Sequence, residues 1–256
     1  MQGSDERGTA TILLLGGTAE ARVLARRILE TWPDARLILS LAGRTLAPDA
    51  VPGALMRIGG FGGAAGLAAF LRETRVARLV DATHPFAAGM SRNAAAAAAR
   101  AGVPRLSLWR PPWDPVAGDD WTPVACLKGA VEALPPGARP FLALGHQHLA
   151  PFFRRADLRP IVRMIDPPDP PLPAAARLVL GRPFPDPAQE AALLAETGAT
   201  HLVCRNSGGA ISYAKIAAAR ALALPVVLIE RPPPPAPPLA ASPAEALVWL
   251  GALKAP

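Results

Sequence analysis

A glycine turn near the N-terminus is the first stretch whose residue types could do chemistry. In "LLLGGTAEARVLA" an apolar run ends at Gly16 and Gly17 and passes into an alanine-rich segment. Thr18 can cap the helix that we expect to follow, and Ala19 and Glu20 fall in its first turn. The first N–H groups of a helix have no partner inside it, so this turn can hold a pyrophosphate. The stretch lacks G-x-G-x-x-G spacing, and a plain structural turn is the alternative.

The end of the next apolar run offers a hydroxyl and a guanidinium where NAD-binding folds carry an acid. The segment "LILSLAGRT" contains Ser40 and Arg44 but no Asp or Glu. A carboxylate there would bind the ribose 2′-hydroxyl of NAD, whereas serine and arginine suit the 2′-phosphate of NADP. The pattern favours NADPH as the cofactor, with an ordinary exposed arginine as the alternative reading of Arg44.

Two more loops whose residues could bind a cofactor follow the third and fourth apolar runs. "IGGFGG" is rich enough in glycine for Gly59 and Gly60 to lie flat against a cofactor. "DATHPFA" would project Asp81, Thr83 and His84 from the end of a strand, and we predict cofactor contacts for Thr83 and His84. A helix-capping or core histidine is the alternative for His84.

The segment "CRNSGGA", in the second half of the chain, has the same kind of residue pattern as the first turn. It ends a predicted strand, opens a predicted helix and carries a cation at Arg205, with Lys215 further along that helix. Small residues with free N–H groups beside a cation make an anion site. We predict that this second site binds an anionic substrate through Arg205, Asn206, Ser207, Gly208, Gly209 and Lys215.

Metal and nucleophile chemistry find little support. His146 and His148 stand two residues apart with no third ligand at metal spacing, so we expect no metal. Ser207 has no G-x-S-x-G context and no evident triad, which argues against nucleophilic catalysis. Cys204 lies within an apolar strand and is expected in the core.

The elements that must position these residues alternate strand and helix. Near-continuous apolar runs such as "RLILSLA" are typical of central parallel strands, and the alternation predicts doubly wound α/β sheets. The segment 110–123 is rich in proline, glycine and acid and has no period, so we interpret it as a junction between domains 1–112 and 113–256. Ligands of such sheets bind at the carboxyl ends of the strands, which points to a cleft between the domains. The predicted strands are 11–15, 36–41, 55–58, 78–81, 105–109, 140–144, 161–165, 177–180, 201–204 and 226–229, and the predicted helices are 19–31, 62–74, 86–101, 125–134, 147–155, 186–197, 209–222 and 243–253.

Composition limits the class of protein. The 256 residues are 51% hydrophobic and 18% charged, which is typical of a globular chain, and no run is long enough for a membrane span. Two cysteines indicate a reducing compartment, so we expect a cytoplasmic protein. The formal net charge of +7 suits a polyanionic substrate. The basic residues are scattered and aromatic residues are few, so nucleic-acid binding is disfavoured.

Three stretches together resemble the precorrin-6A reductases of cobalamin biosynthesis. They are "LLLGGTAEARVLA", "DATHPFAAGMSRNAAAAAARAGVPRLSLWRP" and "RNSGGAISYAKIAAARALALPVVLIERP", and they occur in family order and spacing. The resemblance implies two Rossmann-like domains that bind NADPH and an anionic corrin-type macrocycle in the cleft between them. It implies reduction of the C18–C19 double bond of precorrin-6A to give precorrin-6B.

The resemblance leaves the proton donor open. His84, Lys215 or a held water could each serve, and the first two are the predicted catalytic residues. Arg205 stands where the family usually carries lysine, so a role there that needs a deprotonatable amine is in doubt. The alternatives are another NADP-dependent reductase of an anionic small molecule, or a nucleotide-binding regulatory module without turnover.

Overall fold

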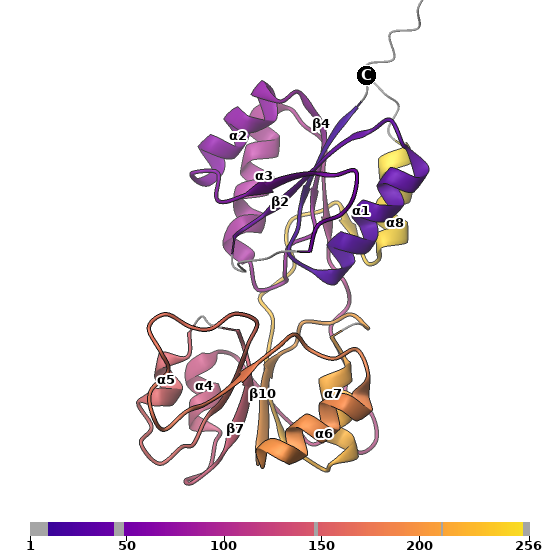
Figure 1. Ribbon diagram of the computed structural model, residues 1–256. Helices are drawn as coiled ribbons and strands as arrows, with labels where there is room; N and C mark the ends of the chain where they lie inside the picture. The colour runs from indigo at the N-terminus through magenta and orange to yellow at the C-terminus, as the bar shows by residue number, and fades with distance from the viewer. Residues whose placement is uncertain (1–9, 44–48, 146–147, 211, 253–256) are drawn as a thin grey trace, which may run out of the picture. The chain divides into compact units, whose positions relative to one another are not determined.

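The chain divides into two compact α/β units. The computed structural model describes residues 10–43, 49–145, 148–210 and 212–252. Unit 1 is Met1–Arg110 with Pro232–Pro256, and unit 2 is Pro111–Arg231 (Figure 1). The first boundary lies two residues from the one expected at 112/113. The expectation that the second domain runs to residue 256 differs from the structure, because the last segment returns to unit 1.

Unit 1 is built on one six-stranded sheet in which every pair of neighbours is parallel. The sheet has the order β12-β5-β4-β1-β2-β3, and the order reverses direction between β1 and β4. That reversal is the switch point at which doubly wound folds bind ligands. The strands are β1 (Thr11–Leu15), β2 (Arg36–Leu41), β3 (Leu55–Ile58), β4 (Val76–Asp81), β5 (Arg105–Leu108) and β12 (Leu239–Ala240).

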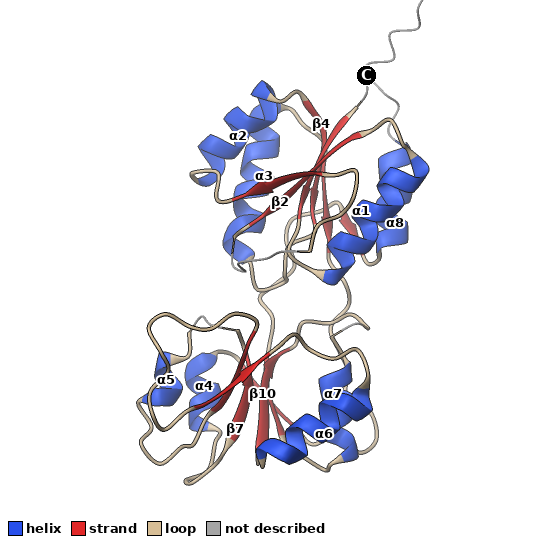
Figure 2. Cartoon of the chain, in the orientation of Figure 1, coloured by secondary structure: helices blue, strands red, loops and turns tan. Residues whose placement is uncertain are grey.

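Helices cover both faces of this sheet. α1 (Ala19–Thr31) and α8 (Pro243–Ala252) lie on one face, and α2 (Gly63–Glu73) and α3 (Ala88–Ala101) lie on the other (Figure 2). Alternate residues of β1 therefore enter different cores: Leu14 packs with the α1 side, and Leu13 packs with the α2 side. Burial on both faces explains why this strand is an unbroken apolar run.

Unit 2 repeats the arrangement with a second all-parallel sheet. Its order is β6-β11-β10-β7-β8-β9, with the switch point between β7 and β10. α4 and α5 lie on one face of this sheet, and α6 and α7 lie on the other (Figure 2). The elements are β6 (Trp121–Val124), α4 (Leu127–Glu132), β7 (Pro140–Ala143), α5 (Ala150–Phe153), β8 (Ile161–Met164), β9 (Arg177–Leu180), α6 (Pro187–Thr197), β10 (His201–Arg205), α7 (Ala214–Ala221) and β11 (Val226–Ile229).

The expected class, α/β with doubly wound Rossmann-like sheets, is confirmed, and the main differences from expectation concern α5, β6, β12 and α7. α5 has only the four residues Ala150–Phe153 where a helix over 147–155 was expected. β6 lies in the segment that we interpreted as irregular, and its Pro123 is tolerated because β6 is an edge strand. β12 is a two-residue strand after the proline-rich run. α7 begins at Ala214 and not at 209, because Gly208 and Gly209 have φ of +65° and +78°, outside the right-handed helical region. No helix within the described ranges is long and apolar enough to cross a membrane.

Candidate functional site

The predicted cofactor residues of unit 1 follow β1, lie at the end of β2, or follow β3 and β4. These strands are parallel and adjacent, so the loops that follow them gather at one edge of the sheet. Gly16 to Glu20 follow β1, Ser40 lies near the end of β2, Gly59 and Gly60 follow β3, and Thr83 and His84 follow β4. The structure therefore brings the described members of this set to the carboxyl edge, whereas Arg44 lies outside the described residues.

The two adjacent glycines of the first turn have different neighbours. Gly16 donates its N–H to the carbonyl of Ser40 at 2.8 Å, and a Cβ on Gly16 would stand 2.7 Å from Leu39 Cδ1. Gly17 has a φ of +108°, and a Cβ there would have no atom within 4 Å in the part of the chain that the structure describes. Gly16 is thus required for packing between β1 and β2, while Gly17 is required for backbone geometry and borders open space.

Thr18 caps α1 as the sequence predicts. Its Oγ1 accepts the N–H of Ala21 at 3.1 Å and donates to the carbonyl of Ala82 at 2.9 Å. The side chain is buried, so both bonds are made away from solvent. One hydroxyl therefore fixes the start of α1 and ties it to the loop after β4. The first N–H groups of α1, at Ala19 and Glu20, lie at the end of the helix that favours anions.

Glu20 forms an ion pair that the sequence analysis did not foresee. Its Oε2 lies 2.9 Å from Nη1 of Arg110, and the two side chains are 12% and 8% exposed. Burial lowers the pKa of Arg110, and the neighbouring Glu20 carboxylate opposes that shift. The arginine compensates an acid that would otherwise repel a phosphate at the start of α1. The sequence signal was Arg110 itself, which stands two residues after the end of β5 in "LSLWR".

The loop after β4 is organised by its own side chains. Asp81 is buried and its Oδ1 accepts from the N–H and the hydroxyl of Thr83, at 3.1 Å and 2.6 Å. His84 Nδ1 accepts the N–H of Phe86 at 3.2 Å. A neutral imidazole with an acceptor at Nδ1 carries its proton on Nε2, so the turn selects the tautomer that can donate from the other nitrogen. The helix-capping alternative does not describe His84, since α3 begins four residues later at Ala88.

In unit 2, both polar atoms of the Asn206 side-chain amide form hydrogen bonds with the backbone of Trp113. Its Oδ1 accepts the N–H of Trp113 at 2.8 Å, and its Nδ2 donates to the carbonyl of Trp113 at 3.0 Å. The indole N–H of Trp113 donates in turn to the carbonyl of Gly209 at 2.9 Å. Asn206 and Trp113 thus fasten the glycine turn to the chain that enters unit 2. The sequence analysis missed Trp113, which lies in the segment 110–123 that it interpreted as a junction.

Lys215 is buried rather than solvated. Its Nζ donates to the carbonyl of Ser212 at 2.6 Å and lies 4.7 Å from the centroid of the Trp113 ring. The prediction that the glycine turn directly opens a helix is wrong, because α7 begins at Ala214. The first N–H groups of α7 therefore do not belong to Gly208 or Gly209. The structure does place the predicted cation at the end of β10, where Arg205 is half-buried.

Ser207 and Gly208 belong to the same tight turn. Ser207 is buried, and its N–H donates to the carbonyl of Arg205 at 2.7 Å. A Cβ on Gly208 would clash with the Pro111 carbonyl and the Arg231 guanidinium. Glycine at this position is therefore explained by packing inside unit 2.

The remaining chemical expectations concern metals and cysteine. Within the described part of the chain no three His, Cys, Asp or Glu side chains gather at a metal site. His146 lies outside the described residues, and His148 has a φ of +69°. Cys204 is fully buried in β10, as expected, and burial raises the pKa of its thiol to about 11 against the opposing charges of Lys215 and Arg163.

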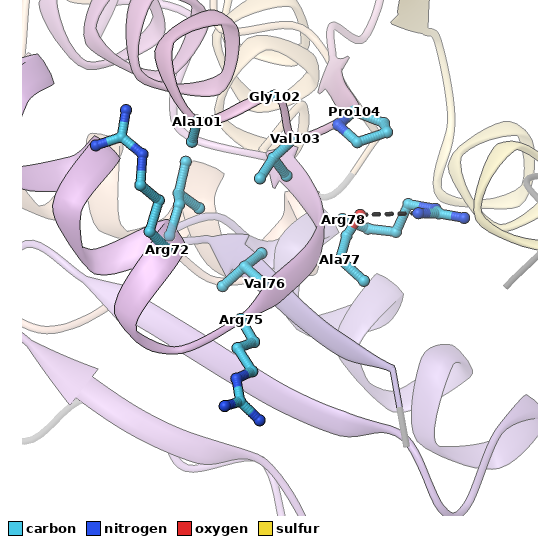
Figure 3. A pocket seen from close by; sticks show the side chains of 10 residues that line it. Arg72, Arg75, Val76, Ala77, Arg78, Ala101, Gly102, Val103 and Pro104 are labelled. Atoms are coloured by element: carbon cyan, nitrogen blue, oxygen red, sulfur yellow. Dashed lines mark hydrogen bonds between the residues drawn. The ribbon is translucent and has the colours of Figure 1, made fainter. Parts of the chain in front are cut away.

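A cavity of about 440 Å³ lies elsewhere in unit 1 (Figure 3). Its lining comes from the start of β4 and from the ends of α2 and α3, which is the sheet edge opposite the loops described above. Arg72, Arg75 and Arg78 belong to the lining, but their guanidinium groups point in different directions in Figure 3. The cavity contains none of the predicted site residues.

Comparisons with known proteins agree over nearly the whole chain. A family model described as "Precorrin-6x reductase CbiJ/CobK" matches residues 11–251. The chain is 47% identical over 242 residues to the precorrin-6A reductase of Rhodobacter capsulatus, covering 93% of this chain and 95% of the relative. It is also 47% identical over 245 residues to the precorrin-6A reductase of Rhodococcus erythropolis, covering 94% and 98%. A solved structure described as "CobK precorrin-6A reductase" superposes with a TM-score of 0.88 at 45% identity, covering 95% of this chain and 97% of that one.

Proposed function

The chain belongs to the precorrin-6x reductase CbiJ/CobK family, and from that premise we propose that it reduces precorrin-6A with NADPH in cobalamin biosynthesis. The observation that carries the proposal is 47% identity over 93% of the chain to a precorrin-6A reductase. The family match spans both units and every stretch that the sequence marked as a site. We assign the protein to the cytoplasm, in keeping with its two unpaired cysteines.

The first turn of unit 1 fits the pyrophosphate of a dinucleotide. Gly17 borders open space, and Thr18 fixes the start of α1, whose first N–H groups can donate to an anion. Arg110 compensates the nearby carboxylate of Glu20. These features support binding of the pyrophosphate by the backbone of Gly17, Thr18 and Ala19.

The neighbouring loops fit the rest of the cofactor. Ser40 lies near the end of β2, where a 2′-phosphate would be bound, and we propose that Arg44 adds the charged contact. Gly59 and Gly60 leave room for a ligand, since a Cβ on either would have no atom of the described chain within 4 Å. We propose that Thr83 and His84 contact the cofactor from the loop after β4.

We assign the anionic macrocycle to the glycine turn of unit 2. Arg205 supplies a charge that suits the carboxylate arms of the substrate, and the excess of basic residues in the whole chain assists capture. Asn206 and Lys215 bind the backbone within their own unit, so we propose that they support the turn rather than hold the substrate directly. We propose that Arg205 makes the charged contact to the macrocycle, and that Ser207, Gly208 and Gly209 shape the turn beside it, since their backbone groups also bind within unit 2.

When bound, NADPH supplies a hydride to one carbon of the C18–C19 double bond, and a proton must reach the other carbon. Of the two predicted catalytic side chains, Lys215 is held against Trp113 and the Ser212 carbonyl. His84 is held by Phe86 in the tautomer that donates from Nε2. A neutral imidazole is too weak an acid to protonate a carbon atom, so these contacts favour a water held by the Nε2–H of His84 as the group that supplies the proton from solvent.

An anaerobic assay of the purified protein with precorrin-6A tests the proposed function. We expect NADPH oxidation that depends on the macrocycle, a product heavier by two hydrogens, and a clear preference for NADPH over NADH. If NADPH is bound but not oxidised in the presence of precorrin-6A, the chain is a nucleotide-binding module or a reductase of a different substrate. Strong salt-dependent binding of duplex DNA, unaffected by NADPH, would instead indicate a nucleic-acid binder.

A further inference from the structure

We propose that Arg57 is a positioning residue that holds the glycine loop after β3 in the shape that receives the dinucleotide. Arg57 is the third residue of β3, and the glycine loop is residues 59–62, which lead into α2. The inference deepens the proposed function and rests on it. It concerns a residue that the sequence pattern did not single out, in "LMRIGGFGG".

The guanidinium of Arg57 contacts this loop and the helix behind it. Nη1 donates to the carbonyl of Gly59 at 2.6 Å, and Nη2 donates to the carbonyl of Gly60 at 2.8 Å. The guanidinium carbon lies 3.7 Å from the ring centroid of Phe61 and 5.2 Å from that of Phe70. One planar fork therefore binds two consecutive carbonyls and stacks on the next side chain, which a lysine ammonium cannot reproduce.

Pinning two consecutive carbonyls also sets the direction of two N–H groups. In a planar trans peptide the C=O of one residue and the N–H of the next point in opposite directions. With the carbonyls of Gly59 and Gly60 drawn to Arg57, the N–H groups of Gly60 and Phe61 point away from the positive charge. Successive N–H groups held in this way form a concave donor site suited to an anionic or polar ligand group.

The two ends of the loop are fixed as well, while its middle is open. The N–H of Gly59 donates to the Leu41 carbonyl of β2 at 2.9 Å. At the other end the Phe61 carbonyl occupies the place of a Cβ on Gly66 of α2. Among the described residues, no atom would lie within 4 Å of a Cβ on Gly60 or Gly62, so this part of the structure leaves room for a ligand beside the loop between these anchors.

The position of Arg57 in the sheet connects this loop to the predicted 2′-phosphate site. Arg57 of β3 pairs in register with Ser40 of β2, and Ser40 pairs in turn with Leu15 of β1, directly before the first glycine turn. The loops that follow β1, β2 and β3 therefore begin next to one another at the same edge of the sheet. Both Nη groups of Arg57 bind carbonyls, so we infer that Arg57 acts on the cofactor through the loop and does not read the 2′-phosphate.

Affinity for the two nicotinamide cofactors tests this inference. Dissociation constants for NADPH and NADH are measured by calorimetry on the full chain carrying Arg57→Lys or Arg57→Gln. Both variants should bind each cofactor about tenfold more weakly, because neither side chain can bridge two carbonyls while stacking on Phe61. The KM for precorrin-6A should stay near that of the unaltered chain. Arg44→Ala gives the contrasting pattern, with a loss for NADPH alone.

Two further variants control for general damage to unit 1. Arg72 of α2 also donates to a backbone carbonyl in the same unit, that of Arg100, so Arg72→Gln should leave both affinities unchanged. Phe61→Leu removes the stacking and keeps Arg57, so it should give a smaller loss for both cofactors.

The outcomes separate the inference from the function on which it rests. Loss of NADPH affinity alone in the Arg57 variants would show direct contact with the phosphate and overturn the positioning role. Restored affinity in Arg57→Lys would show that charge alone matters, and unchanged affinity for both cofactors would remove any role of Arg57. If the unaltered chain bound neither cofactor, the proposed function itself would fail.

Discussion

At the scale of single residues, the side chains of residues 16–20, or their absence at the two glycines, decide whether the first turn of unit 1 has room for a ligand. The two glycines look equivalent in the sequence, yet a Cβ would clash with Leu39 at Gly16, whereas at Gly17 it would have no described atom within 4 Å. Thr18 and Glu20 were expected to act locally, but both also bind distant parts of unit 1, at Ala82 and Arg110. The sequence predicted the residue types of the site, whereas these long-range partners required the fold.

Gly17→Val tests whether the open space at the turn is occupied by the cofactor. The φ of +108° strains any branched residue, at a cost of roughly 1–2 kcal/mol, and the side chain would fill the space that we assign to the pyrophosphate. We expect NADPH affinity to fall at least tenfold while the near-ultraviolet circular dichroism of the tryptophans in unit 2 is retained. NADPH affinity equal to that of the unaltered chain would reduce this stretch to a structural turn.

Arg110→Met tests the ion pair behind that turn. The change leaves the Glu20 carboxylate, only 12% exposed, without its cation, which should lower the free energy of unfolding by roughly 3 kcal/mol. It also leaves a negative charge beside the phosphate site, so NADPH affinity should fall. The matched double variant Arg110→Met with Glu20→Gln removes the charge and should recover much of both losses. A double variant as weak as the single one would contradict the electrostatic explanation.

The two cysteines should differ sharply in reactivity. Burial raises the pKa of Cys204 to about 11 from an ordinary value near 9, and Cys126 is exposed. A disulfide reagent at mildly alkaline pH should therefore label one thiol in the native chain and two after denaturation. Because the folded pKa is the higher one, the contribution of Cys204 to stability is complete below about pH 9 and declines as the pH rises toward about 11. Equal labelling rates in the native state would contradict the burial of Cys204.

At the scale of elements, periodicity predicted most strands and helices, and it failed where an edge strand or a glycine intervened. The strands 11–15, 36–41 and 55–58 have the predicted bounds, and the first of them is an unbroken, fully buried apolar run. β6 escaped prediction because an edge strand with a proline has no apolar pattern. The helix predicted over 209–222 begins only at Ala214. Its alanine-rich composition gave no sign that Gly208 and Gly209 have positive φ values, which are incompatible with a right-handed helix.

A pair of substitutions in α8 tests whether the C-terminal segment completes the core of unit 1. Leu250 is buried in the cluster that includes Leu24 and Ile28 of α1, whereas Val248 of the same helix is 72% exposed. Leu250→Ala should lower the free energy of unfolding by roughly 2–3 kcal/mol, and Val248→Ala by less than about 0.5 kcal/mol. Denaturant unfolding with a probe in unit 1 measures both. Similar small effects would show that α8 does not stabilise this unit.

At the scale of the whole molecule, each sheet consists of five strands in a shared order and one additional edge strand, β12 in unit 1 and β6 in unit 2. β12 follows unit 2 in the chain and pairs with β5 of unit 1, and β6 precedes the regular elements of unit 2 and pairs with β11. Apart from these two edge strands the sheets have the same order, with the switch point beside β1 in unit 1 and beside β7 in unit 2. A division of the chain by composition could not foresee this, because the returning strand has only two residues and follows a proline run.

The central claim, that this chain transfers a hydride from NADPH to precorrin-6A, is tested most directly by an isotope experiment. NADPH carrying deuterium at both C4 positions is given to the protein with precorrin-6A under anaerobic conditions, and the product is analysed by mass spectrometry. The account predicts one deuterium in the product, bound to carbon, and no such transfer from equally labelled NADH at comparable rate. A reduced product without deuterium, or no reduced product, would contradict it.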